Sequence, residues 1–372
     1  MIEFIPLEDY FSFFLNLSLV VVLMTLVHAY VLKIDDGKNL LFINGIGYFL
    51  LFFLILYIGL RPVSGRFFGD MRTYARHFNY YSGGGEVVIE KDVFFHYYMK
   101  VTSYFMSVHG FFTLCAFLYI FPLYRVAKAF FKEYWFYAFL MFIVSFSFWS
   151  YGTNGIRNGI ATSLFILALS YENKKVIMYG VLLIACMVHN SLYLPLLAFV
   201  MTLFYNNPKG YLIGWLCAIP LSIALGGFWE NFFAGLGFAD DRLGGYLGGE
   251  VDQEAFSSTG FRYDFLLYSA SAVFAGWYFI FKKGFSDKFY HRVFNTYLTC
   301  NAFWVLVIRA NFSNRFAYLS WFLLGFIIVY PYLKRRFFKN HYIALGKIIF
   351  IYFAFTYFMF VVYYGVTKAS QV

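Results

Sequence analysis

The chain has 372 residues, of which 62% are hydrophobic, 25% aromatic and only 13% charged. A soluble globular domain typically carries about 25% charged residues, so this composition excludes a water-soluble domain and predicts a polytopic membrane protein. The formal net charge of +10 would suggest nucleic acid in a soluble protein, but the lysines are spread over short segments between apolar runs, and no nucleic-acid partner is expected.

Twelve apolar runs follow one another along the chain, most of them near the ~20 residues that a helix needs to cross a bilayer. We therefore expect an all-α membrane helical bundle with about twelve transmembrane helices and a single membrane domain over residues 1–372. The runs 175–188 and 191–205 are short for a full crossing. The runs lie at residues 10–32, 40–60, 104–124, 134–152, 156–171, 175–188, 191–205, 211–228, 264–281, 290–308, 316–333 and 342–364.

Two connections between these runs are long. The first, 61–103, ends in VFFHYYMKVTSYF, a pattern typical of an interfacial amphipathic helix. The second, 229–263, is rich in glycine. Two long loops on one helical scaffold are a common plan for a membrane enzyme with lids.

Orientation follows from the positive charges. If the N-terminus lies outside and the runs alternate, the inner loops carry sixteen Lys and Arg against five Asp and Glu, and the outer segments eleven against fourteen. Positive charge is enriched in cytoplasmic loops, so both long loops are predicted to face outward.

The kind of cation also differs between the two sides. Twelve of the sixteen inner basic residues are lysine, whereas nine of the eleven outer ones are arginine. Arginine binds phosphate or carboxylate bidentately and keeps its charge, so its concentration on the outer side indicates an anionic ligand. The alternative to ligand binding is that individual arginines snorkel or pair with outer aspartates. The nine are Arg61, Arg66, Arg72, Arg76, Arg157, Arg242, Arg262, Arg309 and Arg315.

The alternation places several ionisable groups at one depth, the outer boundary. Such groups at helix ends are functional candidates when they face a bundle interior. Five separate segments of the chain reach this boundary and carry such groups. The groups are Asp70; Arg157; His189; Arg262 with Asp264; and Arg309 with Arg315.

Five stretches in this order carry a resemblance across nearly the whole chain. They are GLRPVSGRFFGDMRTY, IEKDVFFHYY, NGIRNGIATSLF around Arg157, MVHNSLYLP with His189 and Ser191, and NFSNRFAYLSWF with Arg315 and Tyr318. In these motifs the chain resembles the EpsG family of Wzy-like bacterial exopolysaccharide polymerases. It departs from the family pattern at Lys91-Asp92-Val93, where Glu-Pro is usual, and at Arg157-Asn158, where Arg-Gln is often found.

The resemblance implies a fold like that of the GT-C-like glycosyltransferases that use lipid-linked sugars. It implies a glycosyltransferase in the bacterial cytoplasmic membrane, with its active site facing outward. Its donor and acceptor would be undecaprenyl-diphosphate-linked oligosaccharides, and its further partners membrane lipid, a chain-length regulator and a flippase.

The reaction needs cations on the leaving diphosphate and a base on the acceptor hydroxyl. We assign catalysis to His189, Asp70, Arg157 and Arg315. His189 has the suitable unperturbed pKa for a base, and Asp70 is the rival base or an anchor for an arginine or a sugar. The predicted diphosphate- and substrate-binding residues are Arg61, Arg66, Arg309, Arg242, Arg262, Tyr74, Ser191 and Tyr318.

No cofactor and no metal are expected. The four cysteines lie inside apolar runs without metal-like spacing, and the acidic cluster of Glu250, Asp252 and Glu254 has no histidine nearby. Three other functions stay open. They are a flippase or transporter of lipid-linked sugars, a membrane acyltransferase, and an enzyme like O-antigen ligase, which differs from a polymerase only in its acceptor.

Overall fold

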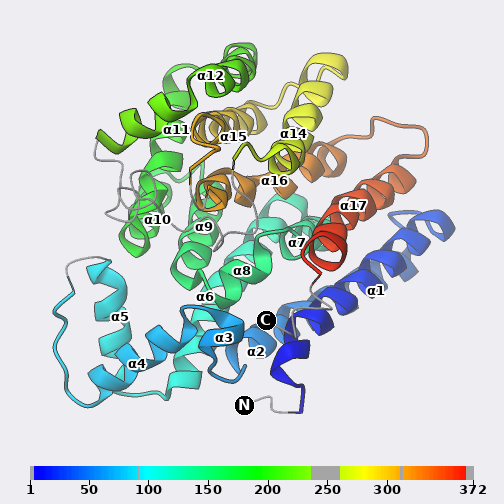
Figure 1. Cartoon of the computed structure of the whole chain (residues 1–372). Helices are drawn as coiled ribbons and strands as arrows, with labels where there is room; N and C mark the ends of the chain where they lie inside the picture. The colour runs from blue at the N-terminus through cyan, green and yellow to red at the C-terminus, as the bar shows by residue number, and fades with distance from the viewer. Residues whose placement is uncertain (1–3, 90–91, 236–259, 311–312, 366–372) are drawn as a thin grey trace. The chain divides into compact units, whose positions relative to one another are not determined.

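The computed structural model describes residues 4–89, 92–235, 260–310 and 313–365, and every regular element in these ranges is a helix. The all-α membrane fold class predicted from the sequence is confirmed. Figure 1 shows these helices in chain order, and contacts divide the chain into two compact units. Unit 1 comprises Met1–Leu192 and Tyr332–Val372, and unit 2 comprises Tyr193–Pro331. The single membrane domain over residues 1–372 stays a prediction.

Unit 1 contains eleven α-helices, three short 3-10 turns and a terminal π-helical turn, as far as the structure describes it. The α-helices are α1 (Tyr10–Val31), α2 (Gly37–Gly59), α3 (Gly65–Phe68), α4 (Met71–Ser82), α5 (Val93–Ser103), α6 (Val108–Phe131), α7 (Trp135–Ile143), α8 (Phe148–Thr153), α9 (Ile156–Leu169), α10 (Lys175–Val188) and α17 (His341–Phe358). The turns are η1 (Leu7–Asp9), η2 (Lys132–Tyr134), η3 (Asn190–Leu192) and η6 (Met359–Tyr363).

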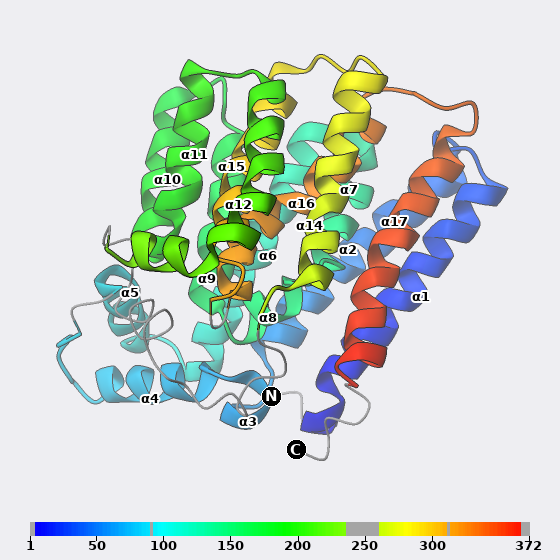
Figure 2. The same ribbon diagram turned by 45° about the horizontal axis from the view of Figure 1, so that its top comes forward.

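Within unit 1, α6 packs against both α2 and α9, and α9 packs in turn against α10. The contact between α2 and α6 is close because Gly59 has no side chain: a Cβ there would lie 2.5 Å from the Cα of Thr113. On the other side of the unit, α1 and α17 lie side by side, as both ribbon views show (Figure 2). The end of α2 lies next to α8, since a Cβ on Gly152 would lie 3.0 Å from the Ile58 side chain.

Unit 2 is built around α15, which packs against α11, α12 and α14. Buried polar side chains link its helices: the Trp215 indole N–H donates to the Asn301 side-chain oxygen at 2.7 Å, and Asn301 donates to the Ser320 hydroxyl at 2.9 Å. The helices of this unit are α11 (Tyr193–Phe204), α12 (Pro208–Gly235), α14 (Tyr263–Trp277), the π-helical η5 (Tyr278–Lys282), α15 (Lys288–Leu306) and α16 (Asn314–Lys334).

All twelve apolar runs of the sequence fall on helices, but the fourth, 134–152, is divided between α7 and α8. Seven helical segments in the described ranges are long and apolar enough to cross a membrane, and three shorter apolar helices accompany them. The seven are Leu7–Val31, Gly37–Gly59, Val108–Ile143, Pro208–Phe233, Tyr263–Lys282, Asn314–Lys334 and His341–Tyr363. Twelve crossings therefore stay a prediction.

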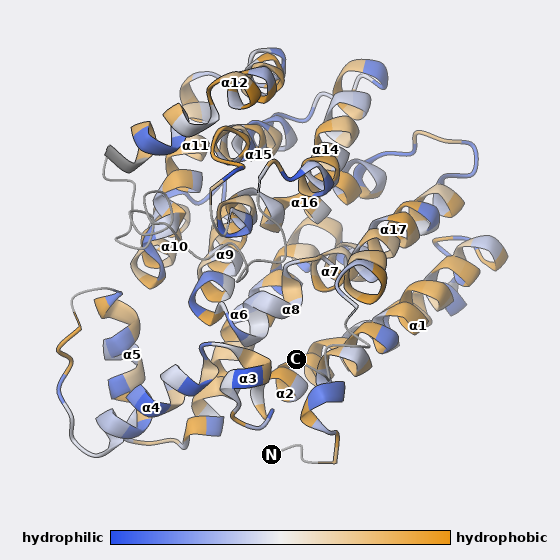
Figure 3. Cartoon of the chain, viewed as in Figure 1, coloured by the Kyte–Doolittle hydropathy of each residue, from blue (hydrophilic) through white to orange (hydrophobic). Residues whose placement is uncertain are grey.

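The long loop 61–103 is mostly helical. Figure 3 shows hydrophilic residues on α3, α4 and α5, in contrast to the apolar ribbons of the long helices. Helix α5 occupies the place predicted for the amphipathic helix, whereas α4 was not predicted. The other long loop begins later than predicted, since α12 continues to Gly235, and residues 236–259 lie outside the described ranges.

Candidate functional site

Helices α4 and α5 pack on each other and on α6 at one end of unit 1. Helix α4 buries Met71, Tyr74, Ala75 and Phe78 at the spacing of one helical face. Their partners include Phe95 of α5, whose ring lies 5.7 Å from that of Tyr74. The loop is therefore a packed layer, which can hold side chains in fixed positions.

A glycine turn ties this layer to the helices below it. Gly69, between α3 and α4, has φ +53°, and a Cβ there would lie 2.3 Å from the Asn154 side-chain oxygen. A residue with a side chain would be strained and would clash, so the turn requires glycine. The same Asn154 oxygen accepts a hydrogen bond from the Asp70 backbone N–H at 2.9 Å. Asp70, itself exposed, is thus fixed beside the turn from α8 to α9.

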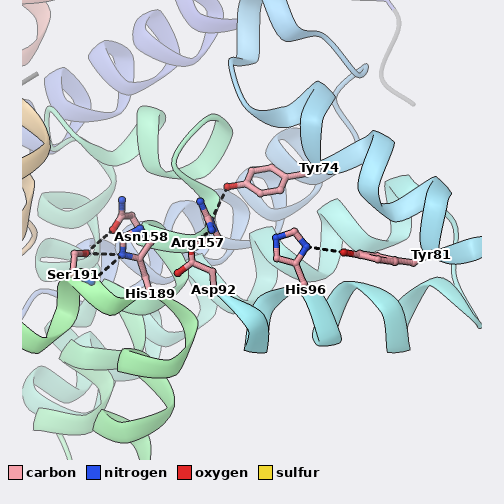
Figure 4. A network of polar contacts seen from close by, with 8 residues as sticks. All are labelled: Tyr74, Tyr81, Asp92, His96, Arg157, Asn158, His189 and Ser191. Carbon is pink, nitrogen blue, oxygen red and sulfur yellow. Dashed lines mark hydrogen bonds and ion pairs between the residues drawn. The ribbon is translucent and has the colours of Figure 1, made fainter. Parts of the chain in front are cut away.

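Arg157 lies in the first turn of α9, and two loop residues hold its guanidinium (Figure 4). Its Nε donates to the hydroxyl oxygen of Tyr74 at 3.0 Å, and its Nη1 forms an ion pair with Asp92. The side chains of Arg157 and Asp92 are only 13% and 16% exposed. Burial raises the pKa of Tyr74, so its hydroxyl stays protonated. The site therefore presents a largely buried, fully oriented guanidinium.

Asp92 was not predicted as a site residue. It precedes α5 in the left-handed conformation, with φ +52°. A short polar residue tolerates this conformation better than most residues do. An acidic residue just ahead of the amphipathic helix was the only signal for it in the sequence.

His189, Ser191 and Asn158 form a second polar group beside Arg157 (Figure 4). The Ser191 backbone N–H donates to His189 Nδ1 at 3.2 Å, and the Ser191 hydroxyl lies 2.7 Å from the same nitrogen. The hydroxyl is also 3.2 Å from the Asn158 side-chain oxygen. Since Asn158 follows Arg157 on α9, the His-x-Ser turn and the arginine are joined through neighbouring residues. The sequence did not indicate Asn158 as part of this site.

His96 of α5 lies deeper in the loop, 5% exposed, with its Nδ1 2.9 Å from the Tyr81 hydroxyl. The ring of His77 stands edge-on to it at 5.2 Å. Burial, together with the nearby His77 and Arg157, lowers the pKa of His96 to about 4. His96 is therefore neutral in the folded protein at neutral pH.

The neutral His96 predicts a loss of stability in acid. Its pKa in the folded chain, about 4, lies below the ordinary histidine pKa of 6.5. Between pH 4 and pH 6.5 the unfolded chain therefore binds more protons than the folded chain. The contribution of His96 to the free energy of unfolding is complete above pH 6.5. It falls by up to ~1.4 kcal/mol per pH unit towards pH 4. Thermal unfolding followed from pH 7.5 to pH 5 should show a smaller loss in His96→Asn than in the wild type. His291→Asn is the control, and an unchanged slope in His96→Asn would contradict the prediction.

Two predicted arginines of the first loop have different surroundings. Arg61 is 1% exposed; its guanidinium donates to the backbone oxygens of Ile58 and, at 2.9 Å, Thr153. This placement gives no support to the predicted diphosphate role of Arg61. Arg66 is exposed on α3 and lies over the Phe67 ring at 5.4 Å.

The predicted residues of unit 2 lie near the starts of α14 and α16. Arg262 pairs with Asp264 at 2.7 Å, and its guanidinium lies 3.7 Å from the centre of the Phe265 ring. This arginine therefore fits the alternative in which an outer arginine pairs with an outer aspartate. Arg309 is exposed. Arg315 is exposed in the first turn of α16, and one turn later Tyr318 packs on Trp321. Arg242 and the acidic cluster at 250–254 lie outside the described residues.

The structure thus brings together two predicted pairs, Tyr74 with Arg157 and His189 with Ser191, on neighbouring parts of unit 1. Among the described residues, no group of three or more His, Cys, Asp or Glu could hold a metal ion. This arrangement can bind an anion through the oriented guanidinium of Arg157, with the His189 imidazole and the Asp92 carboxylate nearby.

Comparison with known proteins gives one match. The profile described as the EpsG family matches residues 44–371, which is nearly the whole chain. No curated protein and no solved structure matches the chain.

Proposed function

The chain belongs to the EpsG family, whose members are polysaccharide-polymerase-like membrane proteins, and from this premise we propose that it joins lipid-linked oligosaccharide repeat units into a surface polysaccharide. The donor would be the growing chain on undecaprenyl diphosphate, and the acceptor a single lipid-linked repeat unit. This makes the protein a membrane glycosyltransferase. A flippase that supplies the units and a chain-length regulator are its proposed partners.

The observation that carries this proposal is the setting of Arg157. The Arg157 side chain is 13% exposed, and Tyr74 and Asp92 hold its guanidinium in place before any ligand arrives. An arginine can grip a diphosphate with two parallel hydrogen bonds. A polar group prearranged where negative charge develops stabilises the transition state without reorganisation.

In the proposed reaction, the acceptor hydroxyl attacks the anomeric carbon of the donor sugar. The bond from this carbon to the diphosphate oxygen breaks, and the undecaprenyl diphosphate leaves with the electron pair. The proton of the hydroxyl passes to a base, for which the sequence offers His189 and Asp70. Arg157 stabilises the leaving diphosphate, and Arg315 is the second arginine that we assign to this task.

We place this reaction on the outer face of the bacterial cytoplasmic membrane, because the charge pattern puts the loop 61–103 outside. In a background without native cysteines, Gly83→Cys should react with an impermeant maleimide on intact spheroplasts. Ser286→Cys and Lys339→Cys, both exposed in the structure, should react only after permeabilisation. The reverse pattern would put Arg157 on the cytoplasmic side and rule out this placement. The cysteines to be replaced are Cys115, Cys186, Cys217 and Cys300.

Deletion of the gene tests the function in cells. A polymerase mutant should accumulate single lipid-linked repeat units that an impermeant oxidant, periodate, reaches from outside in spheroplasts. Loss of a flippase would leave the units inaccessible from outside, and loss of an acyltransferase would leave the polymer long but unmodified. Loss of a ligase would leave long polymer on its lipid carrier. Each of these three results would reject the polymerase.

A further inference from the structure

Asp92 precedes helix α5 but does not cap it. An aspartate in this position commonly accepts a hydrogen bond from a backbone N–H of the first helical turn. The Asp92 side chain forms no such bond, and it forms an ion pair with Nη1 of Arg157 instead. Its backbone also adopts the left-handed conformation, at φ +52°, which residues other than glycine adopt rarely. The preferences of the helix start therefore do not explain the contact with Arg157.

The ion pair also involves the part of Arg157 that a phosphate would use. A guanidinium forms two parallel hydrogen bonds through Nη2 together with either Nε or Nη1. In the structure, Nε donates to the Tyr74 hydroxyl and Nη1 to the Asp92 carboxylate (Figure 4). Nη2 has no hydrogen-bond partner among the described residues. A phosphate that binds at Nη2 must therefore share a second nitrogen with Tyr74 or Asp92, or replace that residue there.

Charge distinguishes these two neighbours of Arg157. Tyr74 accepts from Nε with a neutral hydroxyl, whereas the Asp92 carboxylate cancels the positive charge of the guanidinium. Both members of the ion pair are largely buried, so water and salt screen their charges only weakly. Like charges held side by side in such a place repel each other strongly. Asp92 therefore opposes a phosphate at Arg157, and Tyr74 does not.

We propose that Asp92 determines which phosphates reach Arg157: its carboxylate competes for the guanidinium, and the diphosphate of the lipid-linked donor displaces it. The inference rests on the proposed function, which supplies this ligand. Anionic phospholipids surround the protein and carry one negative charge in the headgroup, whereas a diphosphate between lipid and sugar carries two. A singly charged headgroup offers Arg157 no more charge than Asp92, which the chain already holds beside it. Asp92 thus rejects bulk lipid by repulsion, while the second charge of the diphosphate favours the exchange.

Asp92→Asn tests the competition directly. Asparagine tolerates the left-handed conformation as aspartate does, so this variant removes the charge and keeps the size and the turn. Undecaprenyl diphosphate should bind roughly 10-fold more tightly to purified full-length Asp92→Asn than to wild type in phosphatidylcholine nanodiscs, because one opposing charge is gone. Weaker binding would overturn the proposal, since it is the result expected if Asp92 only orients Arg157. Asp35→Asn, at an exposed residue of the inner loop 33–39, is the matched control and should bind like wild type.

Nanodiscs that also contain phosphatidylglycerol test the selectivity. This lipid should weaken the binding of undecaprenyl diphosphate to Asp92→Asn by roughly 10-fold, because its headgroup then occupies Arg157. It should weaken binding to wild type and to Asp35→Asn much less, and equally in both. The general repulsion between an anionic bilayer and the ligand acts on all three proteins and is removed by comparing them. An equal effect on all three would contradict the role of Asp92 in specificity.

Arg157→Lys distinguishes a failure of this inference from a failure of the proposed function. If Arg157→Lys binds undecaprenyl diphosphate and polymerises repeat units like wild type, Arg157 is not the diphosphate site and the proposed function fails. If Arg157→Lys is defective while Asp92→Asn has wild-type affinity in both kinds of nanodisc, the proposed function stands and the competition is rejected. The inference predicts a third result, in which Arg157→Lys is defective and phosphatidylglycerol slows polymerisation specifically in Asp92→Asn.

Discussion

Replacing Arg157 with lysine is expected to slow polymerisation by roughly 10²–10³-fold, the usual effect of removing one prearranged donor at a developing charge. Lysine keeps the positive charge but loses the planar fork. In the structure, Nε of Arg157 is committed to Tyr74 and Nη1 to Asp92, so the orientation of the guanidinium depends on both. An ammonium group cannot reproduce this pair of contacts and grip a diphosphate bidentately as well.

The control for this variant is Arg125→Lys, at an exposed arginine of α6 that the charge pattern places on the inner side. It should polymerise like wild type. The measurement is the chain-length distribution of polymer in a deletion strain that expresses each variant at equal level. A normal distribution with Arg157→Lys would mean that Arg157 only holds the loop 61–103 in place, and the diphosphate role would be abandoned.

Arg315→Lys is expected to cause a loss of similar size, at least ~10²-fold. Arg315 is exposed in the first turn of α16, where the helix dipole disfavours a cation by ~0.3–1 kcal/mol. A positive charge at this position is therefore unfavourable for the helix itself. As with Arg157, lysine would keep the charge and lose the bidentate geometry.

Two further variants make the Arg315 prediction specific. Arg335→Lys, on the segment that follows α16 and is exposed, should have no effect on chain length. The double variant of Arg157 and Arg315 should lose less than the product of the two single losses if both arginines serve one diphosphate. Fully independent losses, or wild-type polymer from Arg315→Lys alone, would remove Arg315 from the catalytic set.

Hydropathy was sufficient to predict the long helices, because lipid-facing and core-facing residues are both apolar. It could not predict α4, whose exposed face carries Arg72 and Arg76. The buried face of α4 does recur at helical spacing, from Met71 through Tyr74 and Phe78, and this period was the signal to use. The break between α7 and α8 has no glycine or proline to mark it, since the chain there reads VSFS.

The site was predictable only where its contacts are local in the chain. His189 and Ser191 are two residues apart, so their turn could be foreseen. Asp92 pairs with Arg157 across 65 positions, and Tyr74 across 83. Such pairings depend on how α4 and α5 pack, which apolar periodicity does not specify. The same limit applies to Arg61, whose burial follows from the packing of α2 on α6 and not from its own neighbours.

Reconstitution tests the polymerase proposal most directly. Purified wild-type protein in liposomes would be given single lipid-linked repeat units extracted from the deletion strain, with no other enzyme present. The account predicts a ladder of longer lipid-linked glycans and one undecaprenyl diphosphate released for each unit joined, with Arg157→Lys forming almost none. Repeat units that stay single, or that cross the bilayer without being joined, would contradict it.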